Sequence, residues 1–189
     1  MVVKKLLALV HDGNLWIGIQ KIAIDGELIH RITGLPKEGP DPGIEFVSKH
    51  EDTKLAQSMK DRFSLTKGKQ GYQTSTIRHQ NIRFTVELLA CKLMRKCRPN
   101  EVPAPIVSIA ANCAKGYSYK WAEYIAREFL EDVRGVQEKG RTFHYSWLLV
   151  LIALVGWREP TEAQFVDVPP HMPGAEIYAS LWVSQDKSL

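Results

Sequence analysis

The sequence lacks the features that would mark it at sight as a secreted protein. Its 189 residues include only three cysteines, Cys91, Cys97 and Cys113, and no N-x-[ST] glycosylation acceptor. A small, odd set of thiols does not make a disulfide framework, so we expect reduced cysteines in a cytoplasmic or nuclear protein. The apolar part of "MVVKKLLALV" is shorter than the core of a secretory leader, so we expect no leader.

The motifs that usually carry catalysis are missing as well. The chain has no G-x-S-x-G, H-E-x-x-H, G-x-x-x-x-G-K-[ST] or G-x-G-x-x-G, and "IDG" at 24–26 lacks the Ser or Thr of an aspartic-protease motif. Cys91 and Cys97 are six positions apart, whereas paired zinc ligands usually lie two to four apart. We therefore predict no enzyme activity, no metal and no cofactor.

Long hydrophobic runs are scarce, and the longest is "FHYSWLLVLIALVGW" at 143–157. As a helix it would span about 22 Å, which is less than the roughly 30 Å of a bilayer's hydrocarbon layer. We therefore predict no membrane partner and a helix buried on most sides in a soluble core. Thr142 is its expected N-cap, and Gly156 with Pro160 is its expected end. On this interpretation Leu151→Asp should unfold the protein.

The composition is otherwise that of an ordinary globular protein. It is 44% hydrophobic and 24% charged, with a net charge of +4, which suits one core of useful size. We predict one helical domain over residues 1–160. Residues 161–189, which contain several prolines, are predicted to form a loosely ordered tail.

Hydrophobic periodicity predicts a mainly α fold of five to six helices with a short N-terminal β-hairpin and an irregular C-terminal tail. The hairpin is expected in "LWIGIQKIAI", and "LPKEGPDPG" and "SLTKGKQGYQTS" are expected to be loops, the second either exposed or mobile. No alternation of strands and helices points to a doubly wound sheet. The expected helices follow Asp25 up to Gly34, cover 51–63 and 76–97, run through "IVSIAANCA", extend from a Ser118 cap to about Gly140, and include the long apolar run.

Basic residues cluster over 78–98, where Glu87 is the only acidic residue. Lys92, Arg95 and Lys96 would share one face of a helix because of their i, i+3, i+4 spacing. Such a face attracts nucleic-acid phosphates, but it equally suits pairing with the acidic helix around Glu128. The candidate nucleic-acid-binding residues are Arg78, Arg83, Lys92, Arg95, Lys96 and Arg98.

Several segments between residues 14 and 160 resemble open reading frames associated with transposable elements in plant genomes. They are "LWIG", "IDGELIHRITGLPKEG", "LLACKLMRKCR", "EVPAPIV", "NCAKG", "FLEDV" and "FHYSWLLVLIALVGWREP". The phrase I-T-G-L-P-x-x-G is also similar to segments of plant mobile-element domains. The resemblance implies a retrotransposon gag-like assembly protein or a descendant retained by the host.

The departures from a complete retroelement product are informative. The chain has no C-x2-C-x4-H-x4-C knuckle, no protease D-[TS]-G and no polymerase Y-x-D-D. Our leading hypothesis is therefore a non-enzymatic protein that acts by association with itself or with another protein, and the alternative is a nucleic-acid-binding module that uses the 78–98 surface. Neither involves a small-molecule substrate.

Overall fold

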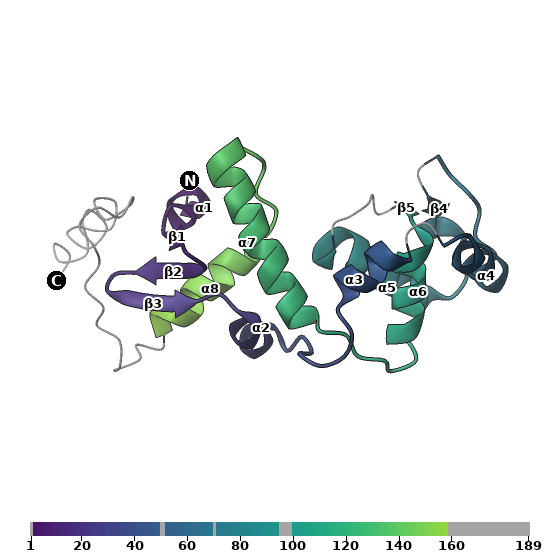
Figure 1. Ribbon diagram of the computed structural model, residues 1–189, viewed down its shortest axis with the longest axis horizontal. Helices are drawn as coiled ribbons and strands as arrows, with labels where there is room; N and C mark the ends of the chain where they lie inside the picture. Colours follow the sequence, from purple (N-terminus) through teal and green to yellow (C-terminus); the bar gives the residue numbers. More distant parts are fainter. Residues whose placement is uncertain (1, 50–51, 70, 95–99, 159–189) are drawn as a thin grey trace. The chain divides into compact units, whose positions relative to one another are not determined.

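The computed structural model describes residues 2–49, 52–69, 71–94 and 100–158. Within these ranges the chain is mainly helical, with eight α-helices and five short strands (Figure 1). The mainly α fold class is thus confirmed, and the helices outnumber the predicted five or six. Residues 161–189, where the loose tail was expected, lie outside the described residues.

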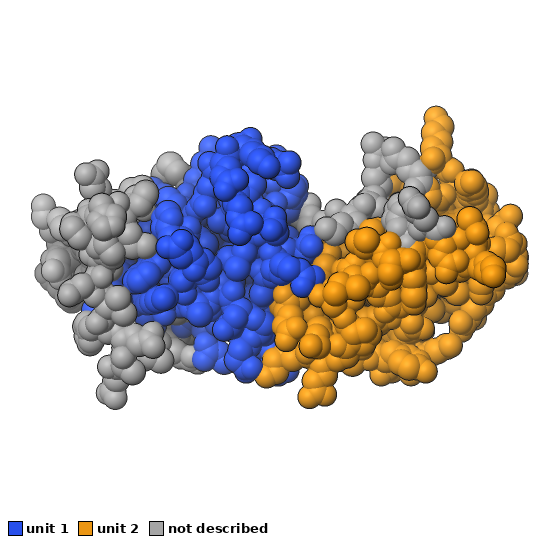
Figure 2. Space-filling view, in the orientation of Figure 1, with its two compact units in different colours: residues 1–34, 126–189 blue, residues 35–125 orange. Residues whose placement is uncertain are grey.

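The chain divides into two compact units, coloured separately in Figure 2. Unit 1 joins residues 1–34 to residues 126–189, and unit 2 consists of residues 35–125. Unit 2 is therefore an insertion in the sequence of unit 1. Whether residues 1–160 unfold cooperatively as one domain stays a prediction.

Unit 1 begins with helix α1 (Val2–Leu7) and a three-stranded antiparallel sheet in the order β1-β2-β3. The strands are β1 (Val10–His11), β2 (Asn14–Ile17) and β3 (Gln20–Ala23). The predicted hairpin is β2–β3, and β1 adds a third strand. Asp12 and Gly13, both with positive φ, connect β1 to β2, as tight hairpins favour.

Helix α2 (Gly26–Thr33) forms where it was predicted, because its signals are local. The carboxylate of Asp25 accepts a hydrogen bond from the Leu28 amide at 2.8 Å, which caps the first turn. Gly34 ends the helix with a φ of 72°, the left-handed conformation that glycine adopts readily. Leu28 and Ile29 are buried.

The last two helices of the described chain are α7 (Trp121–Lys139) and α8 (Ser146–Arg158). The predicted cap of α7, Ser118, is wrong: its hydroxyl donates to the Glu38 carbonyl, and the Ala122 amide of the first turn donates to the Pro36 carbonyl. Thr142 is likewise not the cap of α8, whose Leu148 and Leu149 amides both donate to the carbonyl of Tyr145. Backbone partners distant in sequence thus replace side-chain caps in α7.

Unit 2 is built around α6 (Ala104–Cys113), against which α3 (Pro42–Ser48), α4 (Thr53–Phe63) and α5 (Gln80–Leu88) pack. Every residue of α6 from Ala104 to Ala111 is buried. Of the two prolines expected in its first turn, Pro105 lies there, whereas Pro103 is the N-cap. The most enclosed helix of the described chain is therefore α6, whereas the sequence suggested the apolar run of α8.

Three further predictions in unit 2 are corrected. The predicted loop "LPKEGPDPG" ends by starting α3, because Asp41 caps the helix and Pro42 fits its first position. The predicted loop before α5 contains strand β4 (Tyr72–Gln73), which pairs with β5 (Glu101–Val102). The helix predicted for 76–97 begins at Gln80 and, after Leu88, continues as a π-helical turn, η2 (Leu89–Leu93).

Candidate functional site

The structure places half of the predicted nucleic-acid-binding residues. Arg78, Arg83 and Lys92 are exposed, whereas Arg95, Lys96 and Arg98 lie outside the described residues. Arg83 forms an ion pair with Glu87 at 3.0 Å on the same helix. Arg83 and Lys92 are nine positions apart, so a helical path directs them to different sides. The shared face expected for Lys92, Arg95 and Lys96 stays a prediction.

Helix α8 is apolar on two opposite faces, but only one of them is buried. Leu148, Leu149 and Ile152 are completely buried, and the helix packs against α1, α2 and β2 of unit 1. The opposite face carries apolar residues that are between 37 and 53% exposed. These residues, which we call the α8 stripe, are Trp147, Val150, Leu151 and Leu154.

The spacing of the α8 stripe makes it one continuous surface. Its members follow the i, i+3, i+4, i+7 pattern, so they line one side of the helix over about 10 Å. No charged residue occurs between Tyr145 and Trp157. Single exposed apolar residues are ordinary, whereas a contiguous uncharged patch on a helix is a candidate interaction surface.

Polar contacts with α7 hold the segment that leads into α8. Asp132 accepts hydrogen bonds from the backbone amide of His144 at 2.6 Å and contacts its Nδ1 atom at 3.0 Å. On either side of His144, Phe143 and Tyr145 both pack on the ring of Phe129. These contacts set the rotation of α8, and so they decide which of its apolar side chains face outward.

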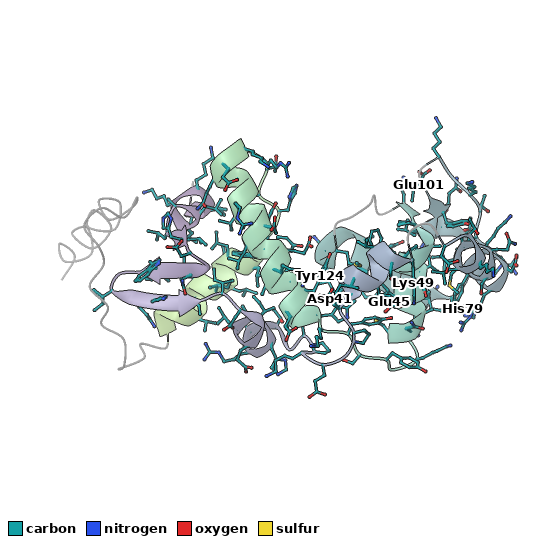
Figure 3. The ribbon with its side chains drawn as sticks, viewed as in Figure 1. Asp41, Glu45, Lys49, His79, Glu101 and Tyr124 are labelled. Carbon is teal, nitrogen blue, oxygen red and sulfur yellow. The ribbon has the colours of Figure 1, made fainter. Side chains whose placement is uncertain are left out.

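A polar cluster in unit 2 was not foreseen from the sequence. The buried Tyr119 hydroxyl accepts a hydrogen bond from the Asn112 side chain at 2.9 Å. Glu45 of α3 is also near this hydroxyl. The Glu45 carboxylate pairs with Lys49 one turn further along α3 (Figure 3). Burial raises the pKa of Tyr119 to about 12; the Asn112 hydrogen bond opposes this rise, and Glu45 adds to it.

The raised pKa of Tyr119 predicts an alkaline loss of stability. The pKa of Tyr119 in the folded state exceeds the ordinary 10.0. Its contribution to the stability of the fold is therefore complete below pH 10 and is lost as the pH rises through about 12. In urea titrations across this interval, Tyr119→Phe should lose less stability with pH than the native chain does. Tyr117→Phe, at an exposed neighbouring position, is the control and should follow the native chain. Parallel curves for all three would contradict the prediction.

The cysteines and candidate metal ligands show no assembled site where the structure describes them. No group of three or more His, Cys, Asp or Glu side chains comes together to hold a metal ion within the described residues. Cys113 is a half-buried free thiol, and burial raises its pKa, which makes it less nucleophilic at neutral pH. The Cys91 side chain and Cys97 lie outside what the structure describes.

Neither a search for membrane-spanning helices nor comparison with known proteins points to another site. Across the described ranges, no helix combines the length and the apolar character needed to cross a bilayer. No protein-family model, curated protein or solved structure matches this chain. The exposed apolar face makes the α8 stripe the candidate functional site. It could not be located from the sequence, because residues 147–155 are all apolar.

Proposed function

We propose that this chain is a non-enzymatic, mobile-element-derived protein that acts by self-association, and that the α8 stripe is its contact surface. The observation that carries the proposal is the exposure of Trp147, Val150, Leu151 and Leu154 on one face of a helix whose other face is buried. The assignment of origin rests on the sequence resemblance alone. Gag-like assembly needs only complementary surfaces, and no catalytic residues.

A second copy of the chain is the occupant that suits the stripe's chemistry. A partner that placed a charge against this surface would bury that charge without a counterion, which costs several kcal/mol. The same stripe on a second copy brings no charge. It also matches itself: in an antiparallel two-fold contact Trp147 lies opposite Leu154, and Val150 lies opposite Leu151, so large side chains meet near both ends of the contact.

Light scattering over a concentration series tests the proposal. The native chain should change from monomer to a larger species as concentration rises, and Leu151→Lys with Leu154→Lys should raise the dissociation constant of the α8 contact at least tenfold, because two anchors become buried cations. The matched control is Ile19→Lys, an exposed residue at the β2–β3 turn of the same unit. It should associate like the native chain.

Two outcomes would contradict the proposal. One is a native chain that stays monomeric at every concentration, as expected if residues 159–189 of the same copy cover the stripe. The other is equal association of the native chain and the double variant. The nucleic-acid alternative stays a prediction, since half of its residues lie outside the described chain and Arg83 pairs with Glu87.

A further inference from the structure

Helix α5 of unit 2 exposes a further pair of apolar residues. Phe84 is 69% exposed and Leu88 is 42% exposed, one helical turn apart, while Val86 between them is completely buried. The helix is held in place by packing against α6 and η2. An exposed phenylalanine of this size is uncommon on a soluble surface, and here it has an apolar neighbour at i+4.

An ion pair runs alongside these two apolar residues. Arg83 and Glu87 are also one turn apart, their Nε and Oε1 atoms are 3.0 Å apart, and their side chains are 46% and 39% exposed. One helical turn of α5 therefore presents an apolar pair next to a cation and an anion. We call Arg83, Phe84, Glu87 and Leu88 the α5 patch.

The charges of the α5 patch are complementary to those of a second copy of the patch when the two helices run antiparallel. A two-fold axis that reverses the direction of α5 places Phe84 of each copy against Leu88 of the other. The same operation brings Arg83 of each copy near Glu87 of the other, with an offset along the helix of two residues, or about 3 Å. Opposite charges then meet twice along one edge of the apolar contact, whereas a parallel two-fold arrangement would put the Arg83–Glu87 pairs of the two copies on opposite edges, where they could not meet.

We propose that the α5 patch is a second self-association surface of this protein, separate from the α8 stripe. The inference deepens the proposed self-association and rests on it only for the size of the assembly. A protein with one two-fold contact stops at a dimer, because each copy's surface is then used. Two different two-fold contacts let each copy bind two others, so assembly continues beyond the dimer, as a gag-like protein requires.

Sedimentation velocity on four full-length chains tests the two surfaces separately. They are the native chain, the α8 variant (Leu151→Lys with Leu154→Lys), the α5 variant (Phe84→Lys) and the combined variant. We expect species larger than a dimer for the native chain, dimers for each surface variant and monomers for the combination. Tyr117→Lys, an exposed aromatic elsewhere in unit 2, is the control and should sediment like the native chain.

The outcomes separate this inference from the proposed function. If the α8 variant is monomeric at every concentration, the α5 patch does not self-associate, although the α8 contact stands. If the α5 variant alone is monomeric and the α8 variant is a dimer, the α5 patch is supported and the α8 proposal fails. Unchanged circular dichroism is required of each variant, so that a misfolded chain is not mistaken for a dissociated one.

Charge exchange in the α8-variant background provides the sharpest test. Arg83→Glu or Glu87→Lys should each weaken the dimer about tenfold, since like charges then meet across the two-fold axis. An equimolar mixture of these two chains should restore dimerisation, because one copy now supplies the anions and the other the cations. A purely structural role for the intrahelical pair predicts no recovery on mixing, and that result would overturn the two-fold arrangement.

Discussion

Replacing Ile152 by aspartate is expected to unfold unit 1, whereas the same change at the adjacent Leu151 should leave it folded. Ile152 is completely buried on the face of α8 that packs inward, and Leu151 is 38% exposed on the α8 stripe. A lone carboxylate at position 152 costs several kcal/mol, a large part of the roughly 5–15 kcal/mol that stabilises most domains. At position 151 the carboxylate reaches water.

Circular dichroism and urea denaturation of the two variants measure this difference. Ile152→Asp should lose its helical signal or unfold at much lower urea than the native chain. Leu151→Asp should change the free energy of unfolding by about 1 kcal/mol or less, as surface changes usually do. This corrects the expectation from sequence that Leu151→Asp unfolds the protein. Equal destabilisation by both variants would mean that Leu151 is buried.

Gly39→Ala, in the loop before α3, should strongly lower the free energy of unfolding. Gly39 has a φ of 109°, and a Cβ atom there would lie 2.2 Å from the carbonyl oxygen of Ser118. Because the obstacle is backbone, it has no flexible side-chain end that could move aside. The substitution combines an unfavourable φ with a steric overlap, so we expect a loss of at least about 3 kcal/mol.

Gly34→Ala is the matched control for this prediction. Gly34 also has a positive φ, of 72°, but nothing lies within 4 Å of the added Cβ. Only the conformational penalty of about 1–2 kcal/mol remains. Urea denaturation should therefore rank the chains as native, Gly34→Ala and then Gly39→Ala in order of decreasing stability. A Gly39→Ala chain as stable as Gly34→Ala would show that the close approach of Gly39 to the Ser118 carbonyl is not required for the stability of the fold.

The elements predicted correctly are those whose signals lie within the element itself. Helix α2 has its cap at Asp25, its stop at Gly34 and its buried residues in one short segment, so sequence was sufficient. Helix α6 likewise has Pro103 as its N-cap and Pro105 in its first turn. The fold class follows from the same local patterns repeated along the chain.

The elements predicted incorrectly depend on partners that are distant in sequence. The first turn of α7 is satisfied by the carbonyl of Pro36 and not by the Ser118 side chain, and β4 exists because β5 pairs with it. Neither partner is visible in a local window. Helix α3 was missed for another reason: its Pro42 and Gly43 read as a loop, although proline is favourable at the first position of a helix.

The sequence by itself determined that the chain is mainly helical, that "SWLLVLIALVGW" forms a helix, and that this helix is too short to cross a membrane. Only the tertiary structure decided which of its apolar residues are buried. Because residues 147–155 are all apolar, hydrophobicity does not select one face of α8. Its neighbours α1, α2 and β2, and contacts such as that of Asp132 with His144, decide which face is buried. Burial of that face leaves Trp147, Val150, Leu151 and Leu154 exposed, and the proposed self-association depends on it.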